Sequence, residues 1–272
     1  MMSNKQSGLK NFAKRFLRSV ISSVQPGALL LGFNPYYTLI FLRHFPRYNR
    51  DRREWLSRGG KITHSYPILC DYSAPAGSTS GHYFHQDLLV ASFVAKKKPN
   101  RHIDVGSRID GFVAHVASFR PIEVVDVRPL SATVHTNIAF VQADLMSQSD
   151  AYPKADSVSC LHAIEHFGLG RYTDPIDPDG YVKGFSNILK MVDKDGMFYI
   201  SFPIGQSNEV HFNTERVFHP LDIFKWTGCD TLNLERFDYV DDAGQLHQNV
   251  ELNGDNINVK HGCGIYSFRK LK

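Results

Sequence analysis

The chain has 272 residues, of which 42% are hydrophobic, 21% charged and 12% aromatic, and its formal net charge is +4. This length and apolar content can bury the core of a folded domain, which excludes a globally disordered chain. Its four cysteines stand far apart, without the spacing of a zinc site or of a disulfide framework. We therefore expect reduced thiols and no metal site.

Basic residues concentrate at the start of the chain. Residues 1–60 carry 11 Lys and Arg against two acids, a local charge of 11 − 2 = +9, so the remainder carries 4 − 9 = −5. We expect an N-terminal extension over 1–60, with an anionic partner, and a main domain over 61–272. No nucleic acid is expected as that partner, because the basic residues lack an interleaved aromatic motif.

An uncharged stretch over residues 19–42 lies within the extension and is long enough to cross a bilayer. Pro26-Gly27 and Asn34-Pro35 interrupt it, and its flanks are basic on both sides. These features favour two short apolar helices over a membrane span or a signal peptide. These helices are expected to pack on the main domain or in a homodimer interface. The alternative is that they lie on a membrane surface. The predicted location is the cytoplasm, with peripheral contact at the inner face of the membrane as the alternative.

Strands and helices alternate through the main domain. A helix is predicted over 82–95, a strand over 102–104 and an amphipathic segment over 112–119. Further strands are predicted over 122–126, 138–144, 155–161, 197–202, 231–240 and 264–268, and helices over 180–191 and 220–226. This alternation predicts an α/β fold in which helices cover both faces of a mostly parallel sheet.

The first three strands end in carboxylates, Asp104, Asp126 and Asp144. A glycine turn, Gly106-Ser-Arg-Ile-Asp-Gly111, follows Asp104, and Asp126 comes about 20 residues later, which is the spacing of a dinucleotide-type βαβ unit. Because the carboxyl ends of parallel strands meet at one edge of a sheet, these three acids are expected to surround a nucleoside ligand.

This order of strands and acids resembles the class I S-adenosylmethionine-dependent methyltransferases. The segments Gly81-His-Tyr-Phe-His-Gln-Asp87, Val125-Asp-Val-Arg-Pro-Leu130 and the run over 165–180 are similar, more narrowly, to domain-of-unknown-function family 268. That family is a methyltransferase-like branch of the fold, and the resemblance extends over about residues 60–270. It implies a Rossmann-like sheet whose last strand is antiparallel, with S-adenosylmethionine as cofactor and S-adenosylhomocysteine as product. It also implies O-methylation of a sugar, glycan or glycolipid acceptor in surface-polysaccharide biosynthesis.

The implied cofactor site begins at the glycine turn, where main-chain N–H groups can face the amino-acid end of the cofactor. Asp126 is expected to accept hydrogen bonds from the ribose hydroxyls, and Asp144 to lie near the adenine amino group. Arg108 stands where the usual G-x-G-x-G turn has its second glycine, so it either clamps the cofactor carboxylate or fills the pocket. The predicted cofactor-binding residues are Asp104, Gly106, Ser107, Arg108, Gly111, Asp126, Val127, Asp144, Leu145 and His162.

The segment Ser159-Cys-Leu-His-Ala-Ile-Glu-His166 supplies the candidate base, because a histidine can accept a hydroxyl proton near neutral pH. The predicted catalytic residues are His166, Glu165 and His211, and the predicted acceptor-binding residues are Arg171, Tyr172, Asp174, Asn213 and Arg216. The acids over 174–179 alternate with prolines, which favours a rigid turn over a divalent-metal loop.

Two other functions remain open. The chain is alternatively a methyltransferase-like protein without catalysis that binds or scaffolds in glycan assembly, which the departures at Arg108 and Gly111 favour. The third alternative, a nucleotide-sugar enzyme on the same sheet, is weaker because no pyrophosphate-type glycine signature is present.

Overall fold

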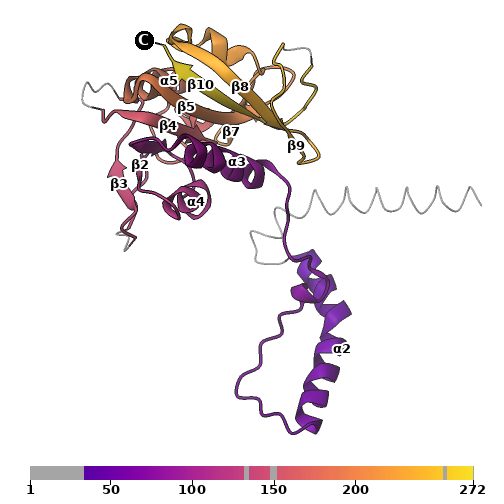
Figure 1. Ribbon diagram of the computed structural model, residues 1–272. Coiled ribbons are helices and arrows are strands. Elements are labelled where there is room, and N and C mark those ends of the chain that lie inside the picture. The colour runs from indigo at the N-terminus through magenta and orange to yellow at the C-terminus, as the bar shows by residue number, and fades with distance from the viewer. Residues whose placement is uncertain (1–33, 132–134, 148–151, 254–255, 272) are drawn as a thin grey trace, which may run out of the picture. The chain divides into compact units, whose positions relative to one another are not determined.

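The structure is a computed structural model, and it describes residues 34–131, 135–147, 152–253 and 256–271 (Figure 1). The chain divides into two units, Met1–Ser78 and Thr79–Lys272. The predicted end of the extension at residue 60 falls inside the first unit and stays a prediction.

A long helix, α2 (Pro35–Ser57), makes up most of the described part of the first unit. The Asn34 side chain caps it by accepting a hydrogen bond from the Tyr36 N–H (3.0 Å), and Pro35 occupies the first helical position, where its missing N–H costs nothing. A 3₁₀ turn, Cys70–Ser73, follows, and the Arg47 guanidinium lies over the ring of Tyr72.

The described helices contain none that is long and apolar enough to cross a membrane. Of the uncharged stretch, residues 19–33 lie outside the described residues. The rest opens α2, which continues well beyond the short apolar helix predicted there.

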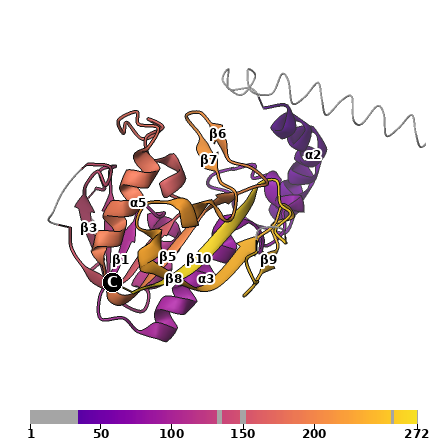
Figure 2. The same cartoon turned by 90° about the horizontal axis from the view of Figure 1, so that it is seen from above.

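Within the described residues, an eight-stranded sheet organises the second unit (Figure 2). Its strand order is β3-β2-β1-β4-β5-β10-β8-β9. The first five strands run parallel, whereas β10 is antiparallel to both of its neighbours, β5 and β8. This topology confirms the predicted fold class. The strands are β1 (His102–Val105), β2 (Ile122–Asp126), β3 (Ile138–Gln142), β4 (Ala155–Leu161), β5 (Val192–Ile204), β8 (Leu232–Val240), β9 (Leu246–His247) and β10 (Gly262–Lys270).

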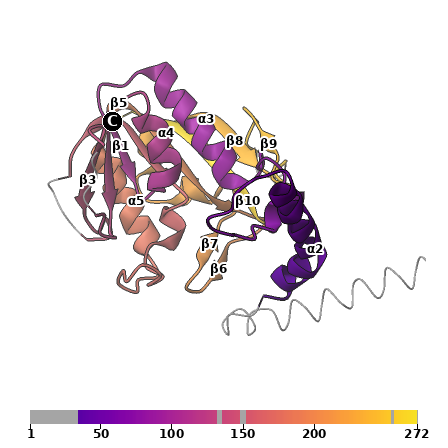
Figure 3. The ribbon, with the colours of Figure 1, turned by 90° about the horizontal axis from the view of Figure 1, so that it is seen from below.

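Helices cover both faces of this sheet, as right-handed crossovers require (Figure 3). On one face, α3 (His82–Lys97) and α4 (Ala114–Ala117) bury Val90, Val94 and Val116 against strand residues such as Val124, Leu161 and Ile265. On the other face, α5 (Gly180–Met191) buries Phe185, Ile188 and Met191 against Val158, Phe198 and Ile200.

Several connections differ from the predicted elements. The amphipathic segment predicted over 112–119 is a π-type turn, Ile109–Val113, followed by the short α4, because the backbone leaves helical geometry at Gly111. The helix predicted over 220–226 is a 3₁₀ turn, Asp222–Lys225. A small hairpin of β6 (Glu209–His211) and β7 (Glu215–Val217) follows β5.

Candidate functional site

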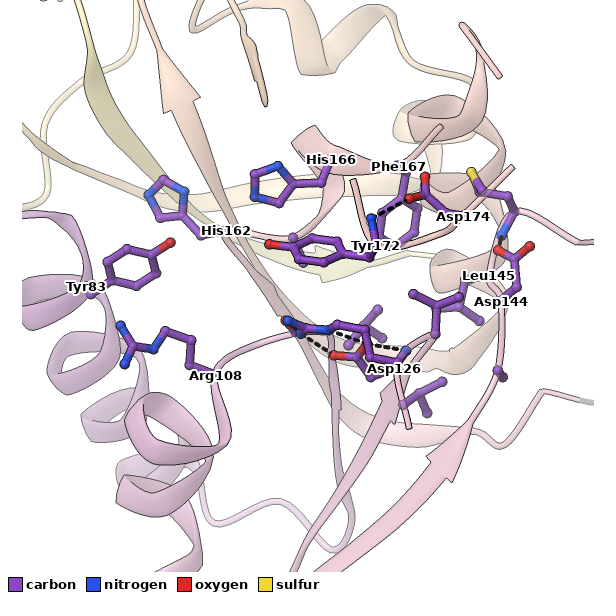
Figure 4. Close-up of a pocket in the computed structure, with 18 residues that line it drawn as sticks. Tyr83, Arg108, Asp126, Asp144, Leu145, His162, His166, Phe167, Tyr172 and Asp174 are labelled. Carbon is purple, nitrogen blue, oxygen red and sulfur yellow. Dashed lines mark hydrogen bonds and ion pairs between the residues drawn. The ribbon is translucent and has the colours of Figure 1, made fainter. Parts of the chain in front are cut away.

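A cavity of about 280 Å³ opens at the carboxyl ends of β1, β2 and β4 (Figure 4). This volume is close to the lower end of the range for small-molecule sites. Main-chain hydrogen bonds hold its walls together: the Gly106 N–H donates to the Val125 carbonyl (2.9 Å), and the Ala143 N–H donates to the Asp126 carbonyl (3.0 Å). The strand ends predicted to surround a ligand therefore do meet around one cavity.

Asp104 lies beneath the glycine turn, fully buried, and it is not among the residues that line the cavity. Its carboxyl group accepts hydrogen bonds from the Ser107 N–H (3.0 Å), the Ser107 hydroxyl (2.7 Å) and the Ser159 hydroxyl (2.5 Å). Burial raises the pKa of Asp104 to about 7, although these donors oppose the rise. The structure thus places Asp104 and Ser107 as the support of the turn.

The turn itself needs its first glycine. Gly106 has a φ of 73°, and a Cβ there would lie 2.8 Å from the Cβ of Ala163. At Gly111 a Cβ would lie 2.6 Å from Asp87 Oδ2, so this glycine, which does not line the cavity, lets the turn pack on α3. Arg108 lies at the cavity edge, where its guanidinium pairs with Asp110 (2.9 Å) and is more than half exposed. It therefore does not fill the pocket.

Asp126 lines the cavity, as predicted, but its carboxylate is already paired. The Arg128 guanidinium donates to both carboxylate oxygens, at 2.9 Å from Nε and 2.5 Å from Nη2, and the Arg128 N–H donates as well (2.8 Å; Figure 4). This pairing raises the pKa of Arg128 above its ordinary value. The same guanidinium lies 4.5 Å from the centre of the Tyr172 ring. A ligand hydroxyl that binds the Asp126 carboxylate therefore has to share it with Arg128 or displace the Arg128 guanidinium.

The far end of the cavity is an apolar slot below Asp144. One Asp144 oxygen accepts from the Met146 N–H (2.8 Å) and the other from the Ser147 hydroxyl (3.1 Å), which fixes the chain after β3. The slot is formed by Val127, Ala143, Leu145, Met146 and Phe167. This apolar lining is typical of the place where an aromatic ring system binds.

His166 faces the same cavity from the 3₁₀ turn Ile164–His166 after β4 (Figure 4). Its Nδ1 lies 2.7 Å from the Thr214 carbonyl oxygen, which can only accept, so Nδ1 carries the proton and Nε2 keeps a lone pair. Burial lowers the pKa of His166 below its ordinary value, although Glu165 Oε1, 3.7 Å from Nε2, opposes this shift. The ring is therefore a neutral proton acceptor at neutral pH.

His162 and Glu165 form a buried pair behind His166. His162 Nδ1 lies 2.7 Å from Glu165 Oε1, and both side chains are almost completely excluded from solvent. His162 lines the cavity, as predicted, whereas Glu165 does not. The backbone of His162 has a φ of 50°, a left-handed conformation that is uncommon outside glycine and that costs conformational energy.

The structure separates the predicted acceptor residues. Tyr172 and Asp174 line the cavity, and Asp174 holds its loop by accepting N–H groups of that loop, including that of Gly168 (2.8 Å). Arg171 is exposed beside His166 and donates to the Thr214 carbonyl (3.0 Å). Asp177 of the 174–179 run also has a protein partner, since it pairs with Lys183 (2.5 Å).

The three residues predicted on the β6–β7 hairpin do not line the cavity. His211 is exposed and bonds Glu209 (2.9 Å), while Asn213 sits at the hairpin turn with a φ of 61°. Arg216 is buried, and its guanidinium donates to the carbonyls of Glu165, Phe167 and Pro178. These contacts make Arg216 a brace between the hairpin and the loop after β4.

Eight cavity residues are not among the predicted site residues, and Tyr83, Arg128 and Phe167 are the ones with the largest or charged side chains. All three lie inside the segments that carry the resemblance to family 268, and that was the signal available for them. Their roles could not be read from spacing. Tyr83 comes from α3 and lies against the ring of His162, with ring centroids 5.1 Å apart, although the two are far apart in sequence.

Comparison with known proteins agrees with the resemblance. The model of a family described as "Caenorhabditis protein of unknown function, DUF268" matches residues 131–261, a little under half of the chain. This confirms the resemblance over that span, which is shorter than the predicted 60–270. No curated protein matches the chain.

Solved structures that resemble this chain include several methyltransferases. The N-methyltransferase NodS from Bradyrhizobium japonicum, in complex with S-adenosylhomocysteine, has a TM-score of 0.44 and 11% identity over 71% of this chain and 89% of its own. The 1,6-didemethyltoxoflavin-N1-methyltransferase of Burkholderia thailandensis has a TM-score of 0.48 and 14% identity over 88% and 91%. An S-adenosylmethionine-dependent methyltransferase from Clostridium acetobutylicum has a TM-score of 0.45 and 12% identity over 83% and 99%. At these scores the fold assignment still rests on the strand order described above.

Proposed function

The model of the DUF268 family matches residues 131–261, and from this match and the cavity we propose that the chain is an S-adenosylmethionine-dependent methyltransferase. The proposed acceptor is a hydroxyl of a sugar, glycan or glycolipid in surface-polysaccharide biosynthesis. The observation that supports the proposal is the cavity at the carboxyl edge of the sheet. Two strand-end carboxylates, an apolar slot and a histidine with a free ring nitrogen all face it.

The residues of the cavity fit the cofactor from end to end. The slot around Leu145 and Phe167 suits the adenine ring, and Asp126 suits the ribose hydroxyls. Arg108, at the rim, can bind the carboxylate of the amino-acid end. When bound, S-adenosylmethionine would supply an electrophilic methyl group, and its positive sulfur suits a cavity lined by Asp126 and Asp144.

Cofactor binding at Asp126 has to accommodate Arg128. A carboxylate has about four acceptor positions, so ribose hydroxyls can bind it beside the guanidinium or can displace the guanidinium. The Arg128 side chain is 42% exposed, whereas that of Asp126 is 10% exposed. The Tyr172 ring offers a displaced guanidinium a second partner.

Methylation of a hydroxyl needs a base, because the oxygen has to lose its proton as it attacks. His166 would accept that proton at Nε2 while Nδ1 continues to donate to the Thr214 carbonyl. Glu165, 3.7 Å from Nε2, would stabilise the imidazolium that forms. Tyr172 and Arg171 lie beside this ring and would position the acceptor.

One observation favours the alternative of a protein that binds without catalysis. The Arg128 guanidinium occupies the carboxylate of Asp126 that would bind the ribose. A protein that no longer binds the cofactor could keep such an ion pair without loss. Binding of the cofactor decides between the two functions.

The test is calorimetric titration of the full chain with S-adenosylmethionine and S-adenosylhomocysteine. We expect micromolar binding, and Asp126→Asn should weaken it by about 1–3 kcal/mol because the ribose loses a charged acceptor. Glu123→Gln is the matched control, since Glu123 lies on the same strand and is ion-paired to Arg101, but does not line the cavity.

Arg128→Ala separates the two functions further. Removing the guanidinium frees Asp126, so the affinity for S-adenosylhomocysteine should stay the same or rise. If neither ligand binds the native chain or the Arg128→Ala chain, the cofactor assignment is wrong and the function without catalysis is favoured.

The proposal extends to the partner of the basic N-terminal region. Helix α2 exposes Leu39 and Leu42 beside basic residues, and such a surface suits the headgroup region of an anionic membrane. Membrane contact would bring the cavity to a glycolipid acceptor. Homodimer formation through the same helix is the other outcome of the test described in the Discussion.

A further inference from the structure

We infer that His82, His162 and Cys263 form a binding site for one zinc ion beside the cavity. His82 begins α3, His162 lies in the turn after β4, and Cys263 lies on β10. One ligand atom from each of these residues lies within 4.8 Å of the other two. The sequence predicts no metal site, because the fold alone brings these three distant segments together.

His162 is oriented as a metal ligand. Its Nδ1 lies 2.7 Å from Glu165 Oε1, which leaves Nε2 as the ring nitrogen that can bind a metal. The side chain is only 4% exposed, and Nε2 has no hydrogen-bond partner among the residues that the structure describes. A buried ring nitrogen without a partner is costly, and a bound cation that takes the place of any proton there would satisfy it. A carboxylate behind the ligating histidine is the usual arrangement at zinc sites, where it fixes the ring and raises its basicity.

Cys263 and His82 complete the set. Cys263 is fully buried with a free thiol, whose nearest polar contact outside its own strand is Gln86 Oε1 at 3.6 Å. The His82 ring stacks on the His162 ring, with centroids 5.3 Å apart and planes 10° apart. His82 is only partly buried, so an ion can reach the two deeper ligands from its side.

Two imidazoles and one thiolate favour zinc over magnesium and calcium. Magnesium and calcium prefer oxygen ligands, which this set lacks. Tetrahedral zinc places neighbouring ligand atoms about 3.4–3.8 Å apart, so these ligand atoms, which all lie within 4.8 Å of one another, have to approach by at most about 1–1.4 Å, a movement within reach of χ rotations. Binding transfers the thiol proton of Cys263 to the buffer.

Three protein ligands leave one coordination position open, as in catalytic rather than closed structural zinc sites. The position is close to the cavity, because His162 lines it and Tyr83 packs on the His162 ring (Figure 4). The inference depends only on these side chains. It does not rest on the proposed methyl transfer, so either can fail without the other.

The experiment uses the full chain without an affinity tag. Metal analysis after dialysis against zinc should give one zinc per chain. Titration of the metal-free chain with Co²⁺ should give intense tetrahedral absorption bands together with a thiolate-to-cobalt charge-transfer band. A chain that takes up neither metal, or a cobalt complex without the thiolate band, overturns the inference even if no variant folds.

Variants assign the ligands. Cys263→Ser should remove the thiolate band and weaken metal binding at least tenfold, whereas Cys229→Ser, a buried thiol elsewhere in the core, should change neither. Glu165→Gln should weaken affinity by about 10–100-fold while keeping the thiolate band, as expected of a positioning residue. Unchanged metal affinity and spectrum in a folded Cys263→Ser chain contradict the site.

Discussion

The ring of His166 owes its proposed role to one hydrogen bond, from Nδ1 to the Thr214 carbonyl (2.7 Å). We predict that ¹⁵N NMR of histidine-labelled protein will show His166 as the neutral tautomer protonated at Nδ1, with a pKa below the ordinary histidine value. The NMR signals of His166 are identified as those that disappear in the His166→Gln variant. The same variant should lower turnover by about 10²–10⁴, the usual contribution of a general base, and leave the affinity for S-adenosylhomocysteine unchanged.

His115→Gln is the control for this prediction, because His115 is exposed and does not line the cavity. An Nε2-protonated ring, or full turnover in His166→Gln, would remove His166 as the base. Turnover is followed as S-adenosylhomocysteine release with a panel of sugar acceptors.

Asp104 gives the fold a pH dependence. Its pKa is raised by burial to about 7 in the folded chain, against an ordinary value of 3.8, so the folded state holds a proton that the unfolded state loses. The contribution to stability is therefore fully present below about pH 4 and is lost as the pH rises towards 7. Asp104→Asn should remove this loss, which is of the order of 2–4 kcal/mol.

The measurement is denaturant unfolding of the native and Asp104→Asn chains between pH 5 and 8. As the pH rises, we expect the unfolding free energy of the variant to increase relative to that of the native chain. Asp110→Asn, at an exposed carboxylate in the same turn, controls for general effects of charge. A gap that stays constant with pH would mean that Asp104 does not hold its proton.

The cavity residues show how far single positions could be predicted from the sequence. Asp126 and Asp144 both line the cavity, and both could be singled out because each comes at or just after the end of a strand, which is predicted from the local pattern. Arg128 could not be identified as the partner of Asp126, because a guanidinium side chain can turn to several neighbours and only the folded loop selects one. Arg216 was predicted to bind the acceptor, whereas its guanidinium donates to three main-chain carbonyls and does not line the cavity.

Helix α2 carries the prediction about partners. It exposes Leu39 and Leu42 beside basic residues, so the full chain should sediment with vesicles that contain phosphatidylserine and much less with phosphatidylcholine alone. The binding should weaken as salt is added. Leu39→Asn with Leu42→Asn should weaken it at least tenfold, since burying each leucine contributes about 1.5–3 kcal/mol.

Phe119→Asn with Val141→Asn is the matched pair, because these exposed apolar residues lie in the second unit. This helix would be excluded as the membrane contact if the two double variants sedimented equally with the anionic vesicles. It would also be excluded if the native chain bound neutral and anionic vesicles equally. A dimer in light scattering that Leu39→Asn with Leu42→Asn dissociates would instead support the homodimer.

Strands and long helices were predictable as elements, whereas turns were not. The strands at 122–126 and 155–161 are apolar runs bounded by turns, and the structure keeps their limits. The amphipathic segment after the glycine turn is a π-type turn followed by a short helix, and Gly111, where the backbone leaves helical geometry, packs against the carboxylate of Asp87. Such a contact depends on α3, which a window of sequence around the turn does not contain.

Strand order is a property of the complete sheet, and the local pattern of the sequence does not specify it. The position of β10 between β5 and β8 was expected only from the resemblance to a known fold. The cluster of His82, His162 and Cys263 shows the same limit. No spacing rule joins a helix start, a strand-end turn and a strand that lie so far apart in the chain.

The place of β10 also determines when this sheet can be completed during synthesis. On the ribosome, β5 emerges long before residues 262–270, and its edge has no partner until they follow. An unpaired apolar edge is a site for pairing with other chains, so the nascent protein passes through an aggregation-prone interval that ends only when β10 inserts. Cys263 arrives on that same strand, so a zinc ion could be bound only after the sheet had closed.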